Sequence, residues 1–195
     1  DRNVFWNSGV VTADVSCAVL AQGAFYQCAK LESVTLNEGV TTIGVGAFHG
    51  CSILPEVTIP KTVTVLSENA FRECPLLETV TFENGIQLES IGNHAFRSCA
   101  KLNDVVLPGS LRLVGEWAFS YCTALENLTV EEGVAVISRD AFQYSGMKNV
   151  VLPSTLDFIG VNLFYQCNQL ETLDLSKCVN VWELYSYTAL RGGSY

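Results

Sequence analysis

The sequence is poor in basic residues and has no long apolar run. Its 195 residues include 11 lysines and arginines against 20 aspartates and glutamates, which gives a net charge of −9. An acidic surface repels phosphate backbones and anionic lipids, so we expect no nucleic-acid partner. No apolar run approaches the roughly 18–20 residues of a membrane-spanning helix, so we expect no membrane insertion. The first residue is Asp1 and no apolar leader follows it, which we interpret as a processed product or a piece of a longer protein.

Sequence motifs for catalysis and metal binding are missing as well. The chain has no Gly-x-Ser-x-Gly, no Gly-x-Gly-x-x-Gly and no Walker loop. Its two histidines, His49 and His94, lie far apart, and none of its eight cysteines forms a Cys-x-x-Cys pair. We therefore expect no enzyme, no cofactor and no metal site.

What the sequence does contain is a repeat. An Ala-Phe pair recurs with Phe-to-Phe steps of 23, 23, 25, 23 and 23 residues, and Leu163-Phe164 follows 22 residues later. Such a constant period predicts stacked structural units that share one core. The phenylalanines of these pairs are Phe25, Phe48, Phe71, Phe96, Phe119, Phe142 and Phe164.

Each unit combines two apolar periodicities. Ile43, Ala47 and Cys51 are four residues apart, which predicts the apolar stripe of a short helix. Val57 and Ile59 alternate with polar residues, which predicts a half-buried strand. We expect an α/β solenoid of about 23 residues per repeat, curved because helices take more room than strands. Its parallel β-sheet would form the concave face and its short helices the convex face.

The repeat extends over the whole chain, so we expect a single domain, residues 1–195. Full repeats would span about residues 20–176. A degenerate first unit, residues 1–20, would carry Phe5 at the cysteine position, and a partial last unit, residues 177–195, would include Trp182 and Tyr187.

The pattern Ile-Gly-x-x-Ala-Phe-x-x-Cys-x-x-Leu-x-x-Val-x-Leu-Pro, found at residues 91–108, resembles the BspA-like class of leucine-rich repeats. Departures are few: Ser145 replaces the cysteine, Leu163 the alanine and Tyr187 the phenylalanine, and two extra residues lie near Gly85. The resemblance implies a non-catalytic scaffold for protein–protein binding or adhesion, at the cell surface or secreted. The alternative is a structural subunit of a larger intracellular or organellar assembly.

Most of the cysteines share one position, three residues after each phenylalanine. We expect a column of buried, unpaired thiols that pack as small apolar groups. Ser145 fills the next position of the column, which therefore needs no disulfide. Cys17 is predicted to be core, and Cys178 falls in a turn. The column comprises Cys28, Cys51, Cys74, Cys99, Cys122 and Cys167.

Two surfaces are candidates for binding a protein partner. The concave strip would present a column that starts at Thr12, although threonine is also simply a good strand former. Its residues are Thr35, Thr58, Thr81 and Thr129, flanked by Glu56, Glu83, Asp104 and Glu131.

The second surface is the predicted helix side, where aromatic residues gather. Trp117 and Tyr121 would share one helical turn, and Tyr144 lies one repeat further on. Tyr26 and Tyr165 occupy similar positions. Scattered surface aromatics are the alternative, but aromatic side chains commonly supply binding energy at interfaces. We hypothesise an aromatic contact patch here.

Overall fold

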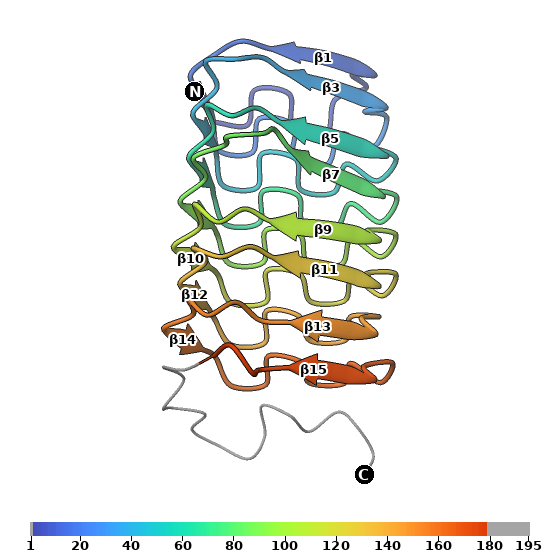
Figure 1. The fold of residues 1–195 in the computed structure, drawn as a ribbon. Helices are drawn as coiled ribbons and strands as arrows, with labels where there is room; N and C mark the ends of the chain where they lie inside the picture. Colours follow the sequence, from blue (N-terminus) through green and yellow to red (C-terminus); the bar gives the residue numbers. More distant parts are fainter. Residues whose placement is uncertain (1, 179–195) are drawn as a thin grey trace.

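The computed structural model describes residues 2–178, which form a stack of parallel coils with three sides (Figure 1). Each coil contributes a long strand to one face, a short strand to the next side, and the Ala-Phe segment to the third, the turn side. The long strands are β1 (Thr12–Val15), β3 (Ser33–Leu36), β5 (Glu56–Ile59), β7 (Thr79–Phe82), β9 (Asp104–Leu107), β11 (Asn127–Val130), β13 (Asn149–Val151) and β15 (Thr172–Asp174). The short strands are β2 (Val19–Leu20), β4 (Thr42–Ile43), β6 (Val65–Leu66), β8 (Ser90–Ile91), β10 (Leu113–Val114), β12 (Val136–Ile137) and β14 (Phe158–Ile159).

Every strand pairing is parallel and joins successive coils. The short strands form one seven-stranded sheet, whereas the long strands form a pair, β1–β3, and a six-stranded sheet from β5 to β15. Thr58 lies opposite Thr81 and Val106 opposite Thr129, so the repeat length sets the register. Residues in β5, β9 and β11 alternate between exposed and buried, which agrees with the predicted period of two.

The predicted short helices are wrong: within residues 2–178 the Ala-Phe segments are turns. Two residues of each segment, two before and two after the phenylalanine, have positive φ angles, as at Asn69 (57°) and Glu73 (58°). A left-handed residue at every fourth position ends each turn before a helix can propagate. The four-residue spacing of the apolar side chains therefore reflects two successive turns.

Backbone hydrogen bonds on the turn side alternate between two directions. Phe25 N–H donates to Ala47 O of the next coil (2.7 Å), whereas Tyr26 N–H donates to Gly23 O within its own coil (3.0 Å). Bonds between coils thus stabilise all three sides, and the helices that we expected to curve the stack are absent from the described residues. We refer to the predicted concave strip below as the long-strand face.

The repeated phenylalanines form a continuous stack through the core. Phe48, Phe71, Phe96 and Phe142 are fully buried, and successive ring centroids lie 5.0–6.0 Å apart with the planes within 15° of parallel. Because each ring packs on those above and below it, a coil completes its core only when its neighbours are present.

The cysteine column lies next to this stack, as predicted, and its six side chains are buried. Each thiol donates a hydrogen bond to the phenylalanine carbonyl of the preceding coil, for example Cys74 to Phe48 (3.1 Å) and Cys122 to Phe96 (3.2 Å). Ser145 Oγ makes the same contact with Phe119 O (3.2 Å). The column position therefore selects a small side chain with a proton to donate.

All eight cysteines are free thiols, and burial raises the pKa of Cys122 to about 12 and that of Cys167 to about 11. We expect eight thiols to titrate in the unfolded chain without reductant, because protonated, buried thiols resist oxidation. In the folded protein only the exposed Cys17 should react rapidly. A chromogenic thiol reagent with and without denaturant measures both numbers, and fewer than six thiols after unfolding would contradict the column.

The N-terminal coil differs from the prediction. Phe5 stacks on Phe25 (5.2 Å) and so occupies the phenylalanine position, not the cysteine position. Thr12 pairs with Ser33, so Asp14 lies opposite Thr35 on the long-strand face, and Cys17 is exposed, not core. These shifts arise because only 20 residues separate Phe5 from Phe25.

The last predicted unit is described only up to Cys178; Trp182 and Tyr187 lie outside the described residues. No helix within residues 2–178 has the length and apolar character needed to cross a membrane.

Candidate functional site

Three positions in each coil of the turn side line up along the stack as columns, which contain both partly exposed side chains and buried ones such as Ser120, Asp140 and Gln143. The columns lie two residues before, one after and two after each phenylalanine. The first contains Gly23, Gly46, Asn69, His94, Trp117, Asp140 and Asn162. The second contains Tyr26, His49, Arg72, Arg97, Ser120, Gln143 and Tyr165. The third contains Gln27, Gly50, Glu73, Ser98, Tyr121, Tyr144 and Gln166.

Trp117 and Tyr121 flank the buried Ser120 of their coil. The guanidinium carbon of Arg97, from the preceding coil, lies 5.4 Å from the centroid of the Trp117 ring and 5.6 Å from that of Tyr121. Both distances fall in the range of cation–π attraction. Sequence reasoning missed Arg97, although its position one residue after Phe96 places it in the column that also holds Tyr26 and Tyr165.

Tyr121 is the first of three tyrosines whose rings contact one another in successive coils. Its ring stacks on Tyr144 at 4.6 Å with an interplanar angle of 18°, and Tyr165 contacts Tyr144 edge-on at 6.0 Å. Tyr121 is 37% exposed, and the other two are half-buried. We call Arg97, Trp117, Tyr121, Tyr144 and Tyr165 the aromatic patch.

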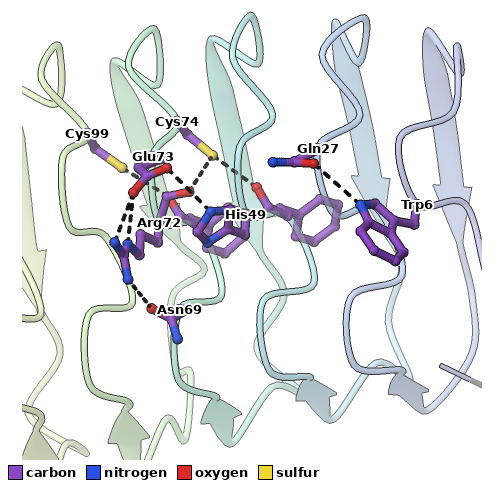
Figure 2. A network of polar contacts seen from close by, with 10 residues as sticks. Trp6, Gln27, His49, Asn69, Arg72, Glu73, Cys74 and Cys99 are labelled. Carbon is purple, nitrogen blue, oxygen red and sulfur yellow. Dashed lines mark hydrogen bonds and ion pairs between the residues drawn. The ribbon is translucent and has the colours of Figure 1, made fainter. Parts of the chain in front are cut away.

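Tyr26 does not join the aromatic patch. It lies near the N-terminal end of the turn side, where its ring stacks on His49 (4.5 Å) and meets Trp6 edge-on (5.8 Å). Figure 2 shows Trp6 and His49 in this region, with His49 Nε2 3.4 Å from Glu73 Oε2. Burial lowers the pKa of His49, although Glu73 opposes that shift. His49 is therefore neutral near pH 7, and its contact with Glu73 is a hydrogen bond.

His94 packs beside the aromatic patch, with its ring centroid 6.3 Å from that of Trp117. Burial lowers its pKa, and Arg97 and Arg72 lower it further. Its Nδ1 atom is buried without a hydrogen-bond partner among residues 2–178. Within the same residues no three His, Cys, Asp or Glu side chains lie close enough together to hold a metal ion.

The backbone beneath the aromatic patch is unusual for such large side chains. Trp117, Tyr121 and Tyr144 have φ angles of 59°, 61° and 59°, a conformation that glycine and asparagine adopt with less strain. The turns impose this conformation on every coil, and the equivalent positions in the coil of Phe48 are glycines, Gly46 and Gly50. Bulky side chains at these positions lower the stability of the fold through backbone strain, which is a reason to seek a functional role for them.

The long-strand face carries the other candidate residues in three columns, with Glu56 and Asp104 in the first, the four threonines in the second, and Glu83 and Glu131 in the third. Thr58 and Thr81 pair in the second column, and Glu56 pairs with Thr79 in the first. The face is mostly polar, and Val106 and Val151, each 49% exposed, interrupt it with apolar groups. Thr35, Thr58, Thr81 and Thr129, like Glu56, Asp104 and Glu131, are exposed, and Glu83 is half-buried.

Hydrogen bonds within the protein already engage several acidic groups of this face. Glu83 accepts a hydrogen bond from the backbone N–H of Lys61 (2.9 Å), and Glu131 accepts one from Gly109 (2.9 Å). Asp104 accepts one from the side-chain amide of Asn127 (2.5 Å). These carboxylates tie neighbouring coils together.

A hollow of about 700 Å³ lies between the turn that carries the two extra residues near Gly85 and strands β7 and β9.

Comparison with known proteins places the repeat in its family. Residues 18–145 and 85–190 match the BspA-type leucine-rich repeat region, with six copies of the repeat. No curated protein matches the chain.

Solved structures show the same architecture. A leucine-rich repeat protein from Bacteroides ovatus is 28% identical with a TM-score of 0.67, over 84% of this chain and 49% of that one. The pneumococcal vaccine antigen PcpA is 29% identical with a TM-score of 0.63, over 69% of this chain and 36% of the antigen. A leucine-rich cell surface protein from Faecalibacterium prausnitzii, 24% identical with a TM-score of 0.55 over 84% of this chain and 47% of that one, shares the fold.

The chain thus spans about half or less of the length of these proteins. The family match extends over most of the sequence and covers the Ala-Phe segments and the cysteine column alike. The chain belongs to the BspA-type leucine-rich repeat family.

Proposed function

We propose that this chain is a non-catalytic protein-binding module that acts at the cell surface or as a secreted protein, and that the aromatic patch is its main contact surface. The observation that supports this proposal is the set of Trp117, Tyr121 and Tyr144 on strained backbone, with Arg97 packed over two of the rings. Strained backbone conformations cluster at ligand-binding and active sites.

The packing of the patch suits a hot spot. The contacts among Arg97, Trp117 and Tyr121, and the stacking of Tyr121 on Tyr144, hold the side chains in place before a partner arrives. Less conformational entropy is then lost on binding. Tryptophan, tyrosine and arginine are also the residues that most often dominate interface energies.

The long-strand face would be a second surface. Its threonines and its carboxylates Glu56, Glu83, Asp104 and Glu131 would supply orientation and electrostatic steering more than affinity. The proposed compartment follows from the relatives, since one similar structure is that of a vaccine antigen and another that of a cell surface protein.

The test compares the wild-type chain with a Trp117→Ala/Tyr121→Ala double variant. Each protein is immobilised and incubated with a protein extract from the environment of the source organism. The retained proteins are identified by mass spectrometry. The affinity of each variant for the purified partner is then measured. We expect the double variant to stay folded, because neither side chain is in the core, and to lose about 2–4 kcal/mol of binding free energy. Phe158→Ala, an exposed aromatic on β14 outside the patch, is the matched control and should bind normally.

Two results would contradict the proposal. If the double variant binds with full affinity while Thr81→Arg abolishes binding, the long-strand face is the contact surface. If the wild-type chain retains no protein beyond those on the blank matrix, the chain is not a protein-binding module.

A further inference from the structure

A separate hollow of about 380 Å³ lies at the N-terminal end of the turn side, away from the aromatic patch. Trp6, Tyr26 and His49 contribute aromatic surface, and Trp6 is 56% exposed. Asn3 and Gln22 add side-chain amides to the lining. Figure 2 shows Trp6 and His49 along this side with the coil of Gln27 between them, and Asn69 and Arg72 further along the same side.

Two of the residues that line the hollow are glycines at a position where later coils carry side chains. Gly23 and Gly46 belong to the column that continues with Asn69, His94 and Trp117. A Cβ atom at Gly23 would lie only 2.0 Å from Asn3 Oδ1, so the Asn3 amide closes over that glycine. At Gly46 such a Cβ would lie in ordinary contact with Tyr26 Cδ2 (3.5 Å) and His49 Cβ (3.8 Å), so this lining position accepts a side chain without a clash.

The charges around the hollow are compensated. The guanidinium of Arg72 lies 3.0 Å from the Glu73 carboxylate and donates to Asn69 Oδ1 (3.4 Å). His49 is neutral near pH 7, because burial lowers its pKa. An anionic ligand would have to compete with Glu73 for Arg72, so the lining favours an uncharged ligand.

We propose that this hollow binds a neutral saccharide. One face of a pyranose ring presents C–H groups that pack on an aromatic ring such as Trp6, and its rim presents hydroxyl groups that both donate and accept hydrogen bonds. The side-chain amides of Asn3 and Gln22 can do the same, whereas the Asn69 amide already bonds to Arg72 and Glu68. The volume is at the lower end of that found for small-ligand pockets, which suits one or two sugar units. This site does not depend on the proposed protein partner.

The decisive variant fills the hollow without removing any group from it. Gly46→Asn adds an amide side chain to the lining beside Tyr26 and His49, and its φ of 59° is one that asparagine accepts, as Asn69 does one coil later. Trp6→Ala removes the exposed ring. Gly85→Asn, at another left-handed glycine with no atom within 4 Å of its Cβ, is the matched control.

Binding is measured by saturation-transfer NMR and by titration of the intact chain. The probes are glucose, galactose, mannose, N-acetylglucosamine, maltose, cellobiose and lactose, at up to about 20 mM, which covers millimolar dissociation constants. We expect at least one sugar to bind saturably. Gly46→Asn and Trp6→Ala should each weaken it at least about tenfold, and Gly85→Asn should leave it unchanged. Thermal melting establishes that each variant is folded.

Three outcomes overturn the proposal. The first is that the wild-type chain binds none of these sugars. The second is that the folded Gly46→Asn and Trp6→Ala variants bind as well as the wild type, which would put the sugar elsewhere. The third is that a random peptide library binds at the hollow in a Trp6-dependent way and no sugar competes, which would make the hollow a peptide site.

Discussion

Replacing Phe96 with alanine is expected to lower the free energy of unfolding by about 3–5 kcal/mol. Phe96 is fully buried and lies between two parallel rings, Phe71 at 5.4 Å and Phe119 at 5.1 Å. Its removal leaves a cavity that the neighbours cannot close, since backbone hydrogen bonds between coils fix their spacing.

The matched control is Phe5→Ala at the end of the same stack. Phe5 is 46% exposed and has a ring neighbour on one side only, Phe25. Phe25 lies between two rings, Phe5 and Phe48, and so is not at the end of the stack. Phe5 is the terminal ring, and its replacement is therefore the one to compare with that of Phe96. Urea unfolding of both variants gives the two free energies. Equal losses would contradict a solenoid in which each coil is stabilised by its immediate neighbours.

Raising the pH above about 9 is expected to destabilise the protein steeply. Burial raises the pKa of Cys122 to about 12 and that of Cys167 to about 11, from an ordinary value of 9.0, and raises those of Cys51, Cys74 and Cys99 further. Between the two pKa values a thiol ionises only in the unfolded chain. Stability is therefore full below pH 9 and decreases as the pH rises toward the folded pKa, by about 1.4 kcal/mol per pH unit for each thiol.

Cys122→Ser isolates this effect from the ionisation of tyrosine and lysine. Serine already occupies the same position at Ser145, where its hydroxyl donates to the Phe119 carbonyl, so the variant should fold. Urea unfolding at several pH values between 8 and 11 should show a slope reduced by about 1.4 kcal/mol per pH unit relative to the wild type. An unchanged slope would mean that Cys122 is not protonated and buried in the folded protein.

The candidate binding residues depend more on tertiary contacts than the core does. Trp117 and Tyr121 can be selected from the sequence by their place in the repeat. The Arg97 side chain that packs over both of them becomes visible only when coils are stacked. Tyr26 has an equivalent sequence position to Tyr165, but two coils of other residues separate it from the aromatic patch, and it contributes to the hollow beside Trp6 instead.

The sequence alone determined the repeat length, the buried phenylalanine and cysteine columns, and the parallel long strands. These features follow from a hydrophobic pattern that recurs at one period, because a single unit cannot bury its apolar face and stacked units bury it in a shared core. The first coil did not follow the pattern, since its shorter spacing shifts Phe5 and Thr12 relative to the later repeats.

Only the tertiary structure decided between a helix and turns in the Ala-Phe segments. Both conformations place apolar residues four apart, and an isolated segment such as 43–51 contains too few residues to tell them apart. Gly46, Gly50 and Asn69 are residue types that favour left-handed backbone. In later coils the position of Gly46 and Asn69 is occupied by His94 and Trp117, which do not indicate that conformation from the sequence. The turns direct every second N–H toward the next coil, where its carbonyl partner lies, whereas a helix would satisfy those groups internally and leave the coils without hydrogen bonds to one another on this side.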